Sequence, residues 1–104
     1  MSFIHFNYSL AMEQVAKLRT IASELSDTAS GDCSHVKSGI KTNWTGNSSE
    51  QYLAKFDKLT SNLTKTSGDI KKVADAMETM ANNIKAAEEE AERIARESAA
   101  GQAG

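Results

Sequence analysis

The feature that most constrains the fold is an apolar repeat running without a break through the second half of the chain. Side chains spaced alternately four and three residues apart form one series there, and twelve of its fourteen positions are apolar. This spacing is typical of a long helix that packs one face against other helices. The series is Tyr52, Phe56, Leu59, Leu63, Thr66, Ile70, Val73, Met77, Met80, Ile84, Ala87, Ala91, Ile94 and Ser98.

A second series with the same spacing lies in the first half of the chain, and it contains an interruption. It starts at Tyr8 and continues to Ala29, then resumes at Cys33 after two consecutive steps of four. Such a stutter predicts local unwinding of the helix near Gly31. The chain has no proline, so nothing else in the sequence forbids long helices.

Between the two series lies a short polar segment that predicts a turn. Trp44-Thr45-Gly46 holds the only tryptophan, and Gly46 suits a positive φ angle. We therefore expect an all-α fold, an antiparallel helix-turn-helix hairpin that forms a single domain over residues 1–104. Its expected parts are a helix over about 8–40, a turn at 43–47, a helix over about 48–98 and a disordered tail at 99–104.

The two expected helices differ in length, which predicts a partner. The second helix overhangs the first by several turns, yet its apolar series continues beyond Asn82. A two-helix core is also thin for independent stability. We expect two hairpins to dimerise into a four-helix bundle, and the sequence leaves intrachain and interchain packing open for the seam residues. The seam candidates are Val15, Leu18, Leu25, Phe56, Leu63, Ile70 and Met77.

Composition argues against several classes of function. The net charge of −2 offers no basic face for nucleic acid, and no apolar run is long enough to span a membrane. Cys33 and His35 lie two residues apart, so on a helix they point to nearly opposite sides and form no catalytic pair. Neither residue has the spacing of a metal site. We expect no enzyme activity, no metal and no cofactor.

The W-x-G turn between two long amphipathic helices resembles the WXG family, the early-secreted-antigen-like (ESAT-like) substrates of type VII secretion in Gram-positive and mycobacterial cells. Trp44, Thr45 and Gly46 carry the resemblance, and nearly the whole chain fits it. The resemblance implies a helical hairpin that pairs as an antiparallel homodimer, or with a paralogous WXG-type or LXG-type protein. It also implies recognition by a type VII export ATPase. Export to the medium or cell surface would follow a cytoplasmic stage, without a cleaved signal peptide.

The chain departs from that family at the C-terminal export signal. The family's Y-x-x-x-D/E motif is absent, because the tyrosines are Tyr8 and Tyr52. A looser family pattern fits Ile84, Glu88, Ala91 and Ala95, which form the candidate export signal. The missing tyrosine predicts either export with a partner that supplies the signal or an accessory role.

Three other functions compete with that of a type VII substrate acting through protein–protein contacts. One is a targeting partner, or chaperone, that binds the helical N-terminal domain of an LXG-type toxin. Another is membrane disruption by released helices, which the acidic polar face disfavours. The third is a cytosolic coiled-coil adaptor that is never exported.

Overall fold

The computed structural model describes residues 6–103, and the side chains as far as Gly101. This part of the chain is helical almost throughout and contains no strand, which confirms the all-α prediction. The elements in order are α1 (Tyr8–Asp27), the π-helix η1 (Thr28–Asp32), α2 (Cys33–Asn43) and α3 (Asn47–Ala103).

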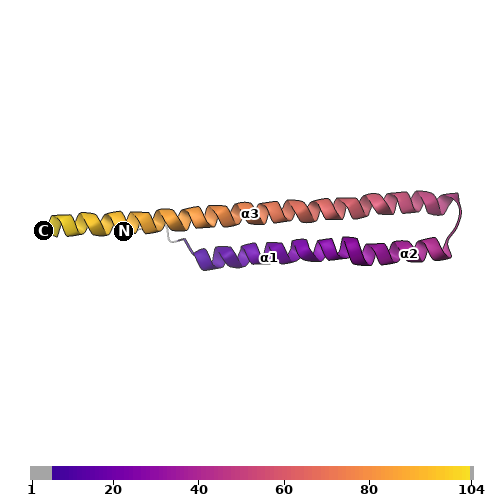
Figure 1. Ribbon diagram of the computed structural model, residues 1–104, viewed down its shortest axis with the longest axis horizontal. Helices are drawn as coiled ribbons and strands as arrows, with labels where there is room; N and C mark the ends of the chain where they lie inside the picture. The colour runs from indigo at the N-terminus through magenta and orange to yellow at the C-terminus, as the bar shows by residue number, and fades with distance from the viewer. Residues whose placement is uncertain (1–5, 104) are drawn as a thin grey trace.

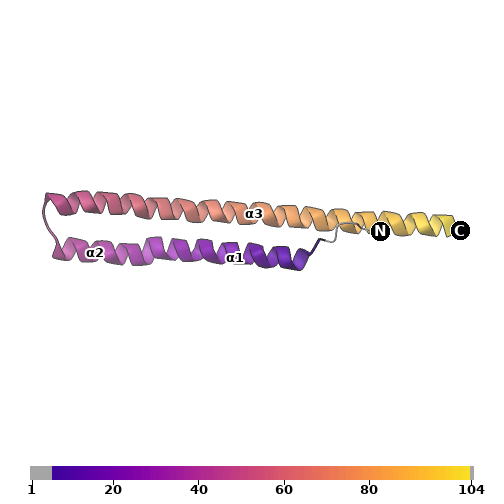
Figure 2. The same cartoon turned by 180° about the vertical axis from the view of Figure 1, so that it is seen from behind.

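Two helical arms lie side by side along most of the molecule (Figure 1). The first arm consists of α1, η1 and α2 in one continuous run, and α3 is the second arm and runs in the opposite direction. Figure 2 shows the same arrangement from behind, with α3 extending past the start of α1. The molecule is therefore a thin rod, 87 Å long and 16 Å across in each of the other two directions.

The helix ends follow from local chemistry. Asn7 has extended backbone angles, and its side-chain oxygen accepts a hydrogen bond from the Leu10 N–H at 3.0 Å, which caps the start of α1. The first arm ends at Asn43, three residues beyond the expected boundary, where Trp44 turns to extended angles. The non-helical turn is limited to residues 44–46, because α3 already begins at Asn47.

The interruption predicted near Gly31 is present as the π-helix η1. The Cys33 N–H bonds to the carbonyl of Thr28, five residues back, instead of four. A π-helical turn holds an extra residue, and this one matches the point where the spacing of buried residues changes. Ala22 and Ala29 are buried seven residues apart, and the next buried residue, Cys33, comes only four later. The wider turn thus keeps the apolar side of the first arm facing α3.

The contact between the arms is built from small side chains. Ala22 and Ala74 are completely buried, and Ser67 donates its hydroxyl to the carbonyl of Ala22 at 2.6 Å. This direct bond from a side chain to the opposite backbone requires the arms to approach closely. Large residues cannot occupy such a line, so they lie along its edges. The buried residues are Val15, Ala22, Ala29, Cys33, Ser49, Ser67, Ala74 and Ala81.

The prediction of a disordered tail is wrong for residues 99–103. The helix α3 continues to Ala103, and Gly104 lies outside the described residues. Alanine is the best helix former, and the tail contains three alanines around Gly101. One glycine costs a helix only about 1 kcal/mol, which is too little to end it.

The tight contact makes a prediction for position 22. Ala22→Leu should destabilise the protein by about 1–3 kcal/mol, because a larger side chain has no room between the arms. Urea unfolding followed by circular dichroism measures the change. Ala16→Leu is the matched control, because Ala16 is exposed on the same helix and should tolerate the same substitution. Equal stability of the two variants would contradict the close contact.

Candidate functional site

The turn places two aromatic rings at one end of the rod. Trp44 and Tyr52 pack with ring centroids 5.5 Å apart and planes inclined by 46°. Gly46 has a φ angle of +116°, which residues with a side chain rarely adopt, as predicted from the sequence. Its carbonyl accepts a hydrogen bond from the Ser49 hydroxyl at 2.7 Å, which fixes the turn to the first turn of α3.

The aromatic pair is partly open to solvent. The Trp44 side chain supports Tyr52 on one side, but 43% of the residue is exposed. Thr45 is exposed as well. A half-buried indole can stabilise the turn and still contact another molecule, so the W-x-G motif lies where a partner can reach it.

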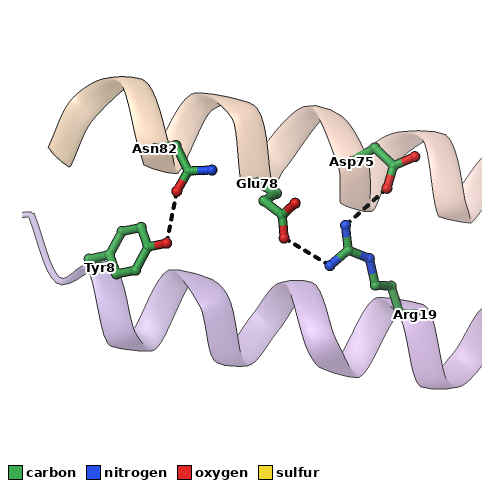
Figure 3. A network of polar contacts seen from close by, with 5 residues as sticks. All are labelled: Tyr8, Arg19, Asp75, Glu78 and Asn82. Carbon is green, nitrogen blue, oxygen red and sulfur yellow. Dashed lines mark hydrogen bonds and ion pairs between the residues drawn. The ribbon is translucent and has the colours of Figure 1, made fainter. Parts of the chain in front are cut away.

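One flank of the contact between the arms is polar. The Arg19 guanidinium bridges Asp75 and Glu78 on α3, each at 2.9 Å (Figure 3). The hydrogen bonds that Arg19 donates to Glu78 and then to Asp75 raise the pKa of Arg19 above its ordinary value. On the same flank, the Tyr8 hydroxyl donates to the Asn82 side chain at 2.8 Å.

Two further contacts extend this polar flank in both directions. Lys37 pairs with Asp57 at 2.6 Å, and the Lys85 ammonium lies 4.4 Å from the centre of the Tyr8 ring. Asp57, Glu78 and Lys85 are separated by multiples of seven residues, so they lie along one edge of α3. These contacts fix the register of the arms along most of α1 and α2. The apolar spacing did not predict these contacts, although charged residues beside an apolar repeat are the signal that could have revealed them.

The opposite edge of α3 carries an exposed apolar line. We give this name to Tyr52, Leu59, Val73, Met80 and Ile94, which are separated by multiples of seven and face one direction. Their exposure is high for large apolar residues: 50% for Leu59, 53% for Val73 and 61% for Met80. Ile70 and Lys71 show why the two edges differ, because they flank the buried line from Ser67 to Ala74 on opposite sides.

The first arm contributes apolar residues to the same side. Leu18 and Arg19 flank the buried line from Val15 to Ala22 on opposite edges, and Arg19 belongs to the polar flank. Leu18 therefore lies on the apolar side, followed one turn later by Ile21, which is 47% exposed. Both arms thus form one apolar face opposite the ion pairs.

The predicted seam residues lie between the arms and this face. Val15 is buried, and the other six are partly buried. The deepest positions on α3 are small residues outside the predicted seam, Ser67, Ala74 and Ala81. The partly buried seam residues are Leu18, Leu25, Phe56, Leu63, Ile70 and Met77.

The candidate export signal lies where the first arm begins, and its residues differ in environment. Glu88 is partly buried and accepts a hydrogen bond from the Phe6 N–H at 3.3 Å, whereas Ala91 and Ala95 are exposed on the overhang of α3. Ile84 helps line a shallow apolar hollow of about 160 Å³, together with Phe6, Met77 and Met80. Within one chain the structure separates this signal from the turn by about 55 Å of helix.

Charges on the overhang pair with each other. Arg93 contacts Glu90 and also Glu97, the latter at 2.7 Å. The hydrogen bond from Arg93 lowers the pKa of Glu90 below its ordinary value. These exposed pairs support the helix locally and contribute little to overall stability.

Among the described residues, no three histidine, cysteine or acidic side chains gather closely enough to hold a metal ion. In the same part of the chain, no helix combines the length and the hydropathy that crossing a membrane requires. The features that remain are surfaces: the aromatic turn, the apolar face and the overhang.

Comparison with known proteins assigns the chain to a class of helical proteins of type VII secretion. The model of the PPE family matches residues 10–99, which is most of the chain, and the protein belongs to that family. This mycobacterial family of secreted helical proteins is related to the early-secreted-antigen (WXG) superfamily. No curated protein and no solved structure matches the chain significantly.

The turn geometry makes a prediction for two glycines. Gly46→Ala should destabilise the protein by about 1–2 kcal/mol, because a φ of +116° strains any residue with a side chain. Gly68→Ala is the control, since Gly68 lies within α3 with open space around it, and it should gain up to about 1 kcal/mol. Thermal unfolding compares them, and a neutral Gly46→Ala would argue against the observed turn.

Proposed function

We propose that this protein is a small type VII secretion substrate of the WXG type, exported as a folded dimer of helical hairpins and acting through protein–protein contacts. Membership of the PPE family supports the secretion system. The antiparallel arms joined by the Trp44 turn support the hairpin as the folding unit. The proposed dimer is a four-helix bundle, formed by two copies or with a paralogous helical protein.

The observation that carries the proposal is the exposed apolar face. A single apolar residue on a surface is ordinary, but Leu59, Val73 and Met80 lie along the same edge of α3 and are all exposed. A helical partner would cover this line in the way that helices cover one another in bundles. The opposite flank is already occupied by the ion pairs of Arg19 and Lys37.

An antiparallel partner would also unite the two candidate recognition elements. The turn and the export signal lie far apart in one chain, at opposite ends of the first arm. In an antiparallel pair, the overhang of each chain starts beside the turn of the other. We propose that Trp44 and the partner's overhang together form the surface that the export ATPase recognises.

The second candidate is an accessory role as a targeting partner for the helical N-terminal domain of an LXG-type toxin. The absence of a Y-x-x-x-D/E signal favours it, because such a partner would supply the missing signal. The same apolar face would bind the toxin domain. A chain that is loosely folded alone and becomes ordered on mixing with a toxin domain would support this candidate, and a stable homodimer would oppose it.

The dimer makes a prediction about mass. Light scattering of the purified chain should give about twice the 11.2 kDa of one chain. The apolar face explains this result, because burial of apolar area drives association. A stable monomer at micromolar concentration would contradict the homodimer.

The composite surface predicts an effect on export. Trp44→Ala should reduce secretion by about tenfold or more, the usual effect of removing an aromatic anchor. Immunoblots of culture supernatant and cell lysate measure the ratio. Lys41→Ala, at an exposed neighbouring position, is the control. Removal of residues 84–104 should have an equal effect, and unchanged secretion of either folded dimeric variant would refute the surface.

A further inference from the structure

We propose that a second copy of this chain docks on the apolar face in one defined register, with the two α3 helices antiparallel and the two-fold axis beside Asn62. The inference rests on the proposed dimer and adds to it the register and the residue pairs. Three features of the described chain carry it: unpaired charges beside the apolar line, the leucines between them, and an apolar hollow at the level that the partner's turn would reach.

The charges beside the apolar line are self-complementary about Asn62. Lys55, Asn62 and Asp69 follow one another at steps of seven, on the side of the line away from the first arm. All three are exposed, and among the described residues neither Lys55 nor Asp69 forms an ion pair. In an antiparallel pair, residues equally far before and after the axis face each other. Lys55 therefore meets the partner's Asp69 twice, once on each side of the axis.

The side chains at the centre of this register are apolar. Leu59 and Leu63 lie three residues before and one residue after Asn62, so the two copies bring four leucines together at the axis. Farther out, Tyr52 lies ten residues before Asn62 and Ile70 eight residues after it, so Tyr52 of each copy comes within one helical turn of the partner's Ile70. The face that the partner would cover is thus apolar along its middle and bordered by matching charges.

The same register brings the turn of each copy to an apolar hollow on the other. The helix α3 begins at Asn47, which lies fifteen residues before Asn62 and so faces the partner's Met77, and the turn that holds Trp44 therefore reaches the partner's hollow. Met80 lines the shallow hollow with Phe6 and Ile84, and it is 61% exposed. Trp44 itself is 43% exposed. A methionine sulfur beside an aromatic ring is a favourable contact, so the Trp44 ring and the partner's hollow would bury each other's exposed apolar area.

Neighbouring registers lose the charge pairs. A shift by one heptad toward the C-terminus places Lys55 against the partner's Ala76, which carries no charge. A shift by two heptads places Asp69 opposite the partner's Asp69, and like charges directly opposite each other oppose pairing. The charges therefore select the axis beside Asn62, and in that register the hollow lies within reach of the partner's turn.

A charge exchange tests the register. In sedimentation equilibrium of the full chain, Lys55→Glu and Asp69→Lys should each weaken the dimer by about tenfold, because each turns two attractions into repulsions. An equimolar mixture of the two variants should recover wild-type affinity, since every facing pair in the mixed dimer is again of opposite charge. Lys65→Glu is the control, because Lys65 is exposed about 100° around the helix from the apolar line, on the side away from the first arm.

The outcomes separate this inference from the proposed dimer. If the wild-type chain is dimeric but Lys55→Glu and Asp69→Lys behave like Lys65→Glu, the register is wrong and the dimer stands. Weakening of both variants without recovery in the mixture also overturns the register. A monomeric wild-type chain overturns the dimer and the register together. High salt should reduce the penalties of the two variants, as expected for exposed charges.

The fluorescence of Trp44 gives an independent readout, because it is the only tryptophan. Its emission should shift to longer wavelength when the dimer is diluted into monomers, since the indole leaves the partner's hollow for water. Met80→Glu should cause the same shift in a sample that is still dimeric. Ile94→Glu is the control, because Ile94 belongs to the same apolar line but lies beyond the partner's turn, and it should leave the emission unchanged. Equal spectra for dimeric Met80→Glu and Ile94→Glu would overturn the docking of Trp44.

Discussion

The close contact of the two arms through small side chains determines the rest of this structure. Ala22 and Ala74 leave no space between the helices, and the hydroxyl of Ser67 reaches the opposite backbone. Large apolar residues are therefore displaced to one edge, and charged residues take the other. A contact made from leucines would have used those large residues within the chain. In this chain the two arms pack through alanines, which leaves an apolar face for other contacts.

The sequence predicted the parts of the fold that depend on periodicity. The two long helices, the turn at Gly46 and the interruption near Gly31 all follow from the spacing of apolar residues and from glycine's freedom of φ. Which residues of the apolar stripe pack between the arms, and which stay exposed, could not be predicted. The repeat marks Leu63 and Leu59 as equivalent, and only the position of the first arm makes one partly buried and the other exposed.

The contacts between the two arms could not be predicted for the same reason. The bridge from Arg19 to Asp75 and Glu78 depends on which residues of two distant segments lie side by side, and a single periodic pattern does not contain that register. The π-helix could be predicted, in contrast, because it follows from a change of spacing within one segment. It also has a distant effect, since without the wider turn Cys33 would rotate away from α3.

The overhang of α3 gives the molecule a gradient of stability. Beyond the start of the first arm, the described residues support this helix only through its own backbone hydrogen bonds and the exposed pairs of Arg93. An unsupported helix of this length is marginal in water, so its amides should exchange with solvent far faster than those near Ala74. Unwinding can therefore begin at the C-terminal end and stop where the arms meet. A force applied at that end would unwind the overhang of α3, several turns long, before it reached the contact between the alanines.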